Sequence, residues 1–261
     1  MSDIAEAGTP ATGPITVAAV ANDQGRRSAW TFVEGAPVRG DTSKKQLALL
    51  FTGGDFGEGT GHILDVLSQH KVTGSFFVTG DYLRKPDLQP RLRRIVADGH
   101  YLGPHSDRHP LYAPWEDRAK TLVTEDAFRV DLQQNIDDLR AYGALKDPSQ
   151  AIYFIPPYEW YNKDQVRWCQ PMGVLLFNLP PGSGSNRDWA PEGHKSFASS
   201  QKIKDDILAY ERKDPHGLNG FLLLLHLGSQ RQDKMHHQFA PLVEALDTLG
   251  YAFVRVDELL K

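Results

Sequence analysis

The feature that most constrains the fold is a regular alternation between Gln46 and Lys261. Apolar runs of strand length alternate there with segments whose apolar residues recur every three or four positions, as on one face of a helix. Most of the runs are apolar at both odd and even positions, which is typical of parallel strands covered by helices. The pattern predicts one α/β domain, a distorted (β/α) barrel. We expect strands at 46–52, 74–79, 151–155, 174–179, 220–226 and 251–256, with a weaker one at 100–103.

Helices are predicted between these strands by residues that start and stop them. Thr60 and Thr124 precede two of the periodic segments, as helix N-caps do. Gly99, Gly143 and Gly250 follow three of them, where glycine commonly ends a helix. The expected helices span 61–70, 87–98, 124–143, 163–172, 202–212 and 236–249.

The first 45 residues differ in composition and do not continue the alternation of strands and helices. Residues 1–14 are rich in Ala, Gly, Thr and Pro and predict a flexible tail, without the apolar stretch of a signal peptide. Residues 15–20 and 29–33 are expected to be short strands that pack outside the main domain. We therefore predict a tail and N-terminal extension of strands at 1–45 and a catalytic domain at 46–261.

Charge and hydropathy exclude two classes of partner. The formal net charge of −4 and the lack of a Lys/Arg cluster argue against nucleic acid. The longest apolar run, Phe221–Leu225, is far too short to span a membrane and predicts a buried strand. With 40% hydrophobic residues, the chain can bury a substantial core.

The sharpest local signal is a pair of histidines, His105 and His109, that follows the short strand expected at 100–103. Two histidines four positions apart would share one face of a helical turn, so both imidazoles would reach one divalent cation. A pair of surface histidines is the alternative. The metal site is favoured because a barrel presents ligands at the carboxyl ends of its strands.

With this pair, the chain from Gln46 to Lys261 resembles the polysaccharide deacetylase family, which includes chitin, peptidoglycan and xylan deacetylases. The order and spacing of several motifs agree as well as their residue types. The matching motifs are His105-Ser106-Asp107-Arg108-His109, the preceding Gly99-His100, Pro156-Pro157-Tyr158, Asp188-Trp189 and Leu224-Leu225-His226.

The resemblance implies a metal-dependent hydrolase that removes acetyl groups from a polysaccharide or glycan, located in the periplasm or secreted. His105 and His109 would bind the metal, and His226 is similar to the family's general acid. Two histidines and a carboxylate suit Zn, while Co, Ni or Mn can substitute. The expected partner is an acetylated glycan.

The first motif of the family is altered. In the family, one Asp is the base and the next binds metal, but these positions fall on Thr52 and Gly53. The Arg that orients the base is Ile155. Either the chain is a catalytically dead relative, or its glycine-rich loop is rebuilt with Asp55 and Glu58 in the vacant roles. We assign Asp55 to the metal and Glu58 to the base. The reverse assignment, or Asp55 alone, is also open.

Aromatic residues supply candidate walls for a glycan groove. Tyr158 and Trp160 follow the proline pair, and Trp189 stands in a long polar loop. Aromatic faces stack on the apolar faces of sugar rings, so all three are expected to bind substrate.

Two other functions remain open. One is a non-catalytic glycan-binding protein on the same scaffold, motivated by the missing Asp pair. The other is a metal-dependent amidase or esterase of a small non-sugar substrate.

Overall fold

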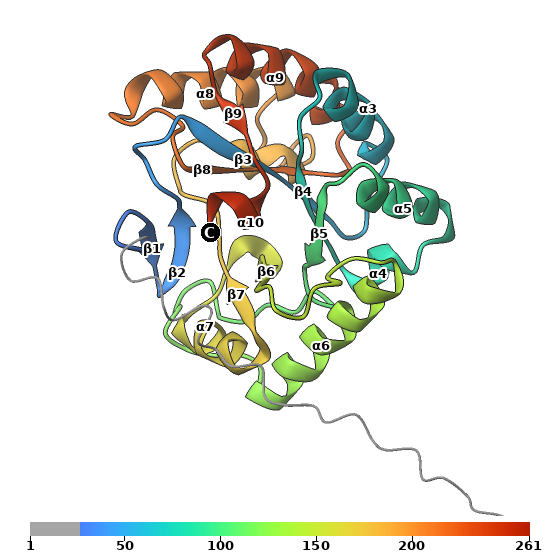
Figure 1. Ribbon diagram of the computed structural model, residues 1–261. Helices are drawn as coiled ribbons and strands as arrows, with labels where there is room; N and C mark the ends of the chain where they lie inside the picture. The colour runs from blue at the N-terminus through green and yellow to red at the C-terminus, as the bar shows by residue number, and fades with distance from the viewer. Residues whose placement is uncertain (1–26) are drawn as a thin grey trace, which may run out of the picture.

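The computed structural model describes residues 27–261, and it shows parallel strands surrounded by helices (Figure 1). Four parallel strands form one sheet in the order β5-β4-β3-β8, and β9 pairs with the start of β3. A second parallel pair, β6 and β7, lies beyond β5. The predicted α/β fold with a parallel sheet is therefore confirmed. These strands are β3 (Gln46–Gly53), β4 (Ser75–Val78), β5 (Tyr101–Pro104), β6 (Ile152–Phe154), β7 (Val174–Leu176), β8 (Phe221–His226) and β9 (Ala252–Phe253).

Helices surround these strands, with α8 and α9 at the top of Figure 1, α3 and α5 at the right and α6 and α7 at the bottom. The longer ones are α3 (Thr60–His70), α5 (Gln89–Ala97), α6 (Glu125–Ala141), α7 (Lys163–Cys169), α8 (Ser200–Lys213) and α9 (Phe239–Thr248). The short ones are α4 (Gly80–Leu83), α10 (Val256–Leu259) and the 3-10 turns η1 (Pro86–Leu88), η2 (Pro157–Glu159), η3 (Gln170–Met172), η4 (Ser185–Trp189) and η5 (Met235–Gln238). None of the helices within residues 27–261 combines the length and the apolar character that a membrane span needs.

Of the two helix N-caps that the sequence predicts, Thr124 is confirmed and Thr60 is wrong. The Thr124 hydroxyl accepts a hydrogen bond from the Ala127 N–H and caps α6, as expected. Helix α3 instead begins at Thr60, with Gly59 as its N-cap. The Thr60 hydroxyl bonds the Gly57 carbonyl at 2.7 Å and lies 2.6 Å from the Tyr82 hydroxyl, so it joins α3 to α4 and does not cap its own helix.

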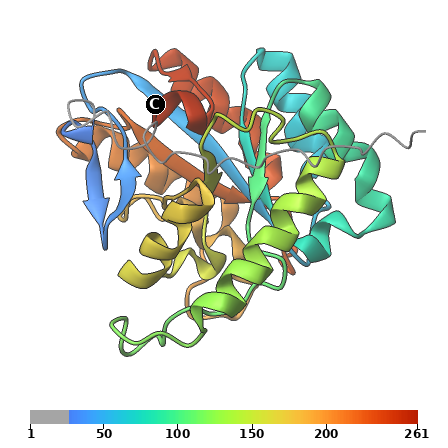
Figure 2. The ribbon, with the colours of Figure 1, turned by 60° about the horizontal axis from the view of Figure 1, so that its bottom comes forward.

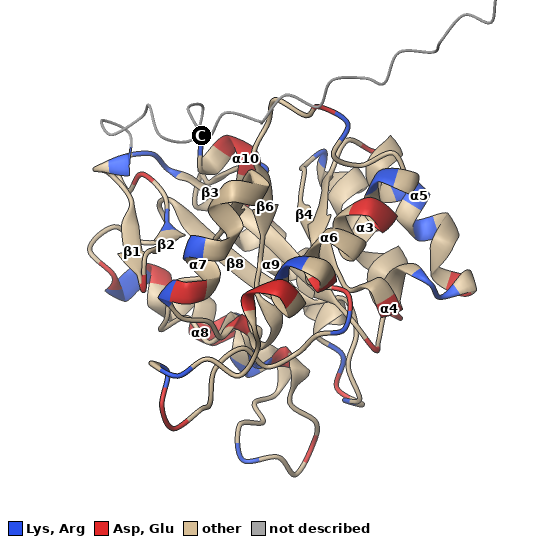
Figure 3. Cartoon of the chain, turned by 90° about the horizontal axis from the view of Figure 1, so that it is seen from below, with Lys and Arg blue, Asp and Glu red and all other residues tan. Residues whose placement is uncertain are grey.

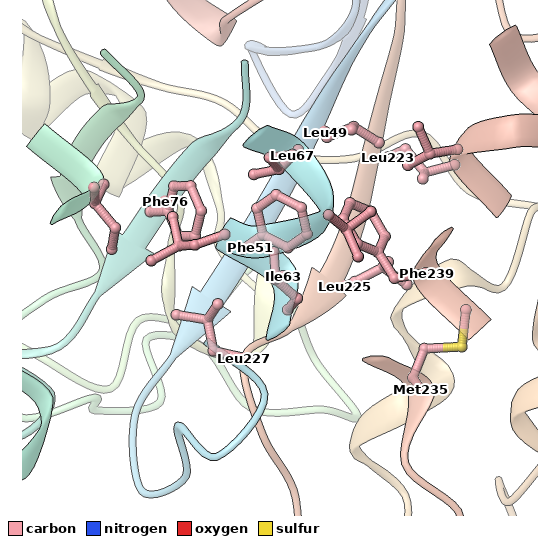
Figure 4. Packing of buried hydrophobic residues seen from close by; sticks show 14 of the residues in the cluster. Leu49, Phe51, Ile63, Leu67, Phe76, Leu223, Leu225, Leu227, Met235 and Phe239 are labelled. Carbon is pink, nitrogen blue, oxygen red and sulfur yellow. The ribbon is translucent and has the colours of Figure 1, made fainter. Parts of the chain in front are cut away.

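The two faces of β3 explain why its sequence is apolar at both parities. Leu49 and Phe51 point toward the helix layer, where Figure 4 shows them packed with Ile63 of α3 and Phe239 of α9. Leu50 points to the other side, into a cluster that includes Phe77 of β4 and Leu224 of β8. Both faces are buried, so apolar residues predominate on both, and Thr52 near the end of the strand is the buried polar exception.

A hairpin made of β1 (Thr31–Val33) and β2 (Ala36–Arg39) adjoins the main body. Gly35 turns the chain between them with a φ of +87°, which favours glycine. Strand β2 is buried, and its Pro37 carbonyl accepts a hydrogen bond from the Asn178 N–H at 3.0 Å. The expected tail at 1–14 and strand at 15–20 lie outside the described residues.

The register of the sheet brings several sequence motifs to one edge. Thr52 pairs with His226 across β3 and β8, and β5 ends at Pro104, directly before His105. The strands are parallel, so their carboxyl ends share this edge. The loop from β5 to α6 projects from the body at the lower left of Figure 2. Figure 3 shows both signs of charge interspersed over the face seen there.

Candidate active site

His105 and His109 meet at this edge. Their Nε2 atoms lie 3.2 Å apart. The Nδ1 of His105 is 2.8 Å from the Ile155 carbonyl oxygen, which can only accept, so Nδ1 carries the hydrogen and Nε2 keeps a free lone pair. The His109 N–H donates to the Ser106 hydroxyl at 2.9 Å. The backbone thus holds both imidazoles facing each other.

The predicted helical turn at this motif is wrong. Ser106 has a φ of +69° and His109 a φ of +55°, both in the left-handed region, and the chain between them bends at Asp107–Arg108. This bend brings the two rings together as a helical turn would. It does so through a left-handed backbone conformation that costs non-glycine residues free energy. Two such residues within one motif indicate a constrained, functional segment.

Burial keeps both histidines neutral. It lowers the pKa of His105 well below its ordinary value, and the nearby His109 and His226 add to this effect. Burial also lowers the pKa of His109 to about 4, although the charge of Asp55 opposes the shift. Neutral imidazole is the form that binds a metal ion.

The histidine pair fits a divalent metal in its donor atoms and spacing. Two nitrogens bound at 2.0–2.1 Å to one tetrahedral Zn lie about 3.3 Å apart, close to the observed separation. Within residues 27–261, however, no three His, Cys, Asp or Glu side chains are arranged to hold one ion as they stand. Asp55 is exposed and lies close enough to His109 to influence its pKa. Its role as the third ligand stays a prediction.

His226 lies at the same edge and is held by Asp188. Its Nδ1 and its backbone N–H reach the two carboxylate oxygens of Asp188, each at 2.7 Å. Burial lowers the pKa of His226, but the negative charges of Asp188 and Glu159 outweigh this effect and raise it. Because Nδ1 donates to Asp188, the Nε2 of His226 is left to exchange a proton with a substrate.

The positions that the sequence analysis aligns with the family's first motif and its Arg hold Thr52, Gly53 and Ile155. Thr52 is buried, and its hydroxyl has no hydrogen-bonding partner within residues 27–261. At Gly53, an added Cβ would lie 2.7 Å from the ring of Tyr82. Ile155 is fully buried. A carboxylate cannot be placed at Gly53 unless Tyr82 moves.

Glu58 forms its hydrogen bonds with the loop after β8, and none with the histidine pair. It accepts hydrogen bonds from the Ser229 N–H at 3.1 Å and from the Lys234 ammonium group at 2.5 Å. Burial raises the pKa of Glu58, but these two donors outweigh it and lower the pKa. A carboxylate with a lowered pKa is a weaker base, and the contacts account for Glu58 as a support of the loop after β8.

The sequence analysis missed Glu159, a carboxylate inside the site. Burial raises its pKa, while His226 and a hydrogen bond with Asn186 lower it. Tyr158 and Glu159 have φ values of +58° and +50°, so two consecutive non-glycine residues are left-handed. Such backbone strain concentrates at functional sites. The one signal in the sequence is its place directly after the Pro-Pro-Tyr motif.

The predicted aromatic residues differ in how freely a ligand can reach them. The ring of Tyr158 is 46% exposed and lies 4.4 Å from that of His109. Trp189 is 43% exposed beside His194. Trp160 is more enclosed, because Arg118 covers one face at 4.4 Å. Trp115, which the sequence analysis missed, is 58% exposed.

Comparisons with known proteins place the chain in one family. The polysaccharide deacetylase family model matches residues 39–175. The peptidoglycan-N-acetylmuramic acid deacetylase PdaA of Bacillus subtilis is 43% identical over 222 residues, which cover 85% of this chain and 73% of that protein. A chitooligosaccharide deacetylase of Sinorhizobium fredii is 38% identical over 192 residues, covering 73% of this chain and 75% of that protein.

Solved structures share the fold. The B. subtilis PdaA structure, a family 4 carbohydrate esterase, has a TM-score of 0.67 at 24% identity and covers 86% of this chain and 84% of its own. A family 4 pseudoenzyme from Bacillus anthracis has a TM-score of 0.67 at 19% identity, covering 88% of this chain and 70% of its own. The chain therefore belongs to the polysaccharide deacetylase family.

Proposed function

We propose that this protein is a metal-dependent hydrolase that removes acetyl groups from a glycan. The observation that carries the proposal is the meeting of two neutral imidazoles, His105 and His109, at the edge where His226 is held by Asp188. This set offers metal ligands and a proton donor in one place, inside a deacetylase family.

Each residue has a distinct part. His105 and His109 would hold the ion, most plainly Zn, with Asp55 as the third ligand. Such an ion would polarise the acetyl carbonyl and acidify a bound water. His226 in its protonated form gives its Nε2 proton to the departing amine or alkoxide. Asp188 fixes the tautomer of His226 and stabilises its charge.

For the substrate, we propose a glycan that contains N-acetylated hexosamines. The relatives support this choice, since they are named as deacetylases of peptidoglycan and of chitooligosaccharides. Such substrates belong to the cell wall or the extracellular space, so we place the protein in the periplasm or outside the cell.

The test is acetate release from acetylated glycans, measured before chelation, after chelation and after Zn or Co is added back. We expect release that disappears on chelation and returns with metal. His105→Ala and His109→Ala should each lose most of the bound metal, because two histidines leave little redundancy. Full metal occupancy in the double variant would refute the site.

A matched pair of variants identifies the base. Glu58 holds the role on sequence grounds, but its partners Lys234 and Ser229 favour a supporting role. Glu159 is the alternative, a half-buried carboxylate whose charge acts on His226. We expect Glu159→Gln to slow turnover by about two to four orders of magnitude, the usual contribution of a general base, and Glu58→Gln to leave turnover nearly unchanged. The opposite result would return the role to Glu58.

A second function, non-catalytic glycan binding, is favoured by Thr52, Gly53 and Ile155 at the positions of the family's Asp pair and Arg. A family 4 pseudoenzyme is known from B. anthracis, and one of its mutants is described as having restored activity. If the wild type binds acetylated glycans but releases no acetate with any metal, this second function holds. Hydrolysis of small amides alone would favour the amidase.

A further inference from the structure

Arg231 is a buried arginine in the loop that follows β8, five residues after His226. Its side chain is 0% exposed, and burial is costly for a group that always carries a charge. The carboxylate of Asp233 pairs with it at 3.4 Å but is itself 41% exposed. Solvent therefore screens much of that attraction, and other groups must hold the guanidinium in place.

Those groups are backbone carbonyls of the long loop between β7 and α8. The Nη1 of Arg231 donates to the Ala190 carbonyl at 3.1 Å and to the Arg187 carbonyl at 3.4 Å. Its Nη2 donates to the Ala198 carbonyl at 2.7 Å, and the ring of Phe197 covers the guanidinium at 4.6 Å. A planar guanidinium can serve several acceptors at once, because its five N–H groups point in fixed directions. One side chain thus fastens this loop at three points.

The same loop and the segment 231–233 are also joined in the other direction. The Glu192 carboxylate accepts hydrogen bonds from the backbone N–H groups of Gln232 at 3.1 Å and of Asp233 at 3.0 Å. The Nε of Arg231 donates to the Asp233 carbonyl at 2.9 Å, which fixes the course of its own side chain. The two loops therefore hold each other in one arrangement.

The two carbonyls that Nη1 contacts lie on either side of Asp188. Asp188 is buried, and its carboxylate oxygens reach the backbone N–H and the Nδ1 of His226, each at 2.7 Å. Hydrogen bonds weaken steeply when their length or angle changes, so Asp188 can orient the imidazole only while its own backbone stays in place. Arg231 holds that backbone before and after Asp188.

We propose that Arg231 is a positioning residue for the acid of the site. Its guanidinium fixes the loop that carries Asp188 and thereby keeps the Asp188 carboxylate against the imidazole of His226. Because Arg231 is fully buried, it acts through Asp188 and offers no atom to a ligand. The inference rests on the proposed function for the part that His226 plays, and its test needs no turnover.

Loss of position and loss of charge have opposite effects on His226. The charge of Asp188 raises the pKa of His226. Were Arg231 only a nearby positive charge, its removal would raise this pKa further, because a like charge disfavours the protonated form. If Arg231 holds Asp188 in place, its removal frees the carboxylate and lowers the pKa. Glu159 and the histidine pair, whose charges also interact with that of His226, are the same in every variant.

The test is the pKa of His226 in the full chain, measured by NMR titration of its imidazole, with His226→Gln to assign the signal. Arg231→Met should lower this pKa by about 1 or more, since an opposite charge at hydrogen-bonding distance shifts a pKa by about 1–3. Arg231→Lys keeps the charge but has no planar fork for the three carbonyls, so it should lower the pKa too. This second variant serves if Arg231→Met fails to fold.

Arg39→Met is the matched control, because Arg39 is likewise buried and donates to the Asn219 and Gly217 carbonyls, near the opposite end of β8. It loses similar contacts and should keep the wild-type pKa of His226. An unchanged or raised pKa in the Arg231 variants would overturn the inference. If the pKa falls as expected but the wild type releases no acetate, only the proposed function is contradicted.

Discussion

The histidines of this site differ in the direction of their pKa shifts, because different groups surround them. His105 is buried against a carbonyl and other histidines, and its pKa falls. His226 is half-buried, and the carboxylates of Asp188 and Glu159 outweigh its partial loss of solvent, so its pKa rises. Burial disfavours charge in both cases, and only a nearby opposite charge reverses the effect. The same residue type thus favours the neutral form at one position and the protonated form at another within one site.

Replacing Asp188 tests the acid directly. His226 donates a proton only in its protonated form, and the raised pKa extends that form to higher pH. Asp188→Asn removes the main charge that raises the pKa, so the alkaline limb of the rate profile should move to lower pH. Activity should therefore fall more at alkaline than at mildly acidic pH.

The measurement is the rate of acetate release across about pH 5 to 9, the range in which histidine titrates. Asp188→Glu, which keeps the charge, is the control and should retain an alkaline limb near that of the wild type. If the alkaline limb of the pH–rate profile were unchanged in Asp188→Asn, another group would supply the proton.

Among the elements, the end of β3 shows how packing limits which side chain a position can hold. Gly53 pairs with Val78 of β4, and the ring of Tyr82 from α4 occupies the space where a side chain would stand. Tyr82 is fixed by a hydrogen bond with Thr60 at the start of α3. Helices α3 and α4 therefore close over the strand end, and a carboxylate at this position has no room.

Gly53→Ala should consequently destabilise the fold by about 1–3 kcal/mol, the usual cost of overpacking a core. Gly54→Ala is the matched control one residue later. There an added Cβ would meet only Thr79, at an ordinary 3.7 Å, and we expect a change within about 0.5 kcal/mol. Chemical denaturation of both variants measures the difference. Equal stabilities would show that Tyr82 moves aside freely.

Across the whole molecule, Arg39 ties the N-terminal hairpin to the chain before β8. Its side chain donates to the Asn219 and Gly217 carbonyls, each at 2.8 Å, and pairs with Asp214 at 3.2 Å. The residue is 7% exposed. Strand β2 is thereby fastened to a segment about 180 positions away, and the family match also begins at residue 39. The predicted boundary at 45/46 divides the chain after this buried strand.

Removing Arg39 should therefore loosen the entire domain. Arg39→Ala leaves the half-buried Asn219 and Gly217 carbonyls without this donor and removes the charged partner of Asp214, and we expect a loss of about 2–4 kcal/mol. Arg129→Ala, which breaks an exposed pair with Glu125 on α6, should cost only about 0.3–0.5 kcal/mol. Thermal and denaturant unfolding of both variants provide the comparison. A small effect of Arg39→Ala would mean that β2 is dispensable for stability.

The sequence by itself determined the elements and the place of the histidines. Each expected strand between Gln46 and Lys261 is present, because strands covered on both faces are mostly apolar at odd and even positions alike. His105 and His226 follow from position alone, since the carboxyl ends of parallel strands share one edge. Both conclusions depend only on the pattern of neighbouring residues along the chain, which can be read from the sequence.

Only the tertiary structure decided which groups meet. Glu58 reaches Lys234 across 176 positions, the ring of Tyr82 fills the space at Gly53, and Trp115 meets Tyr158. Glu159 lies in the site because its backbone is left-handed, and its residue type does not predict that conformation. Such partners lie far apart in sequence, and no spacing rule relates them. Packing brings them together, and packing sets the pKa, the available space and the exposure on which function depends.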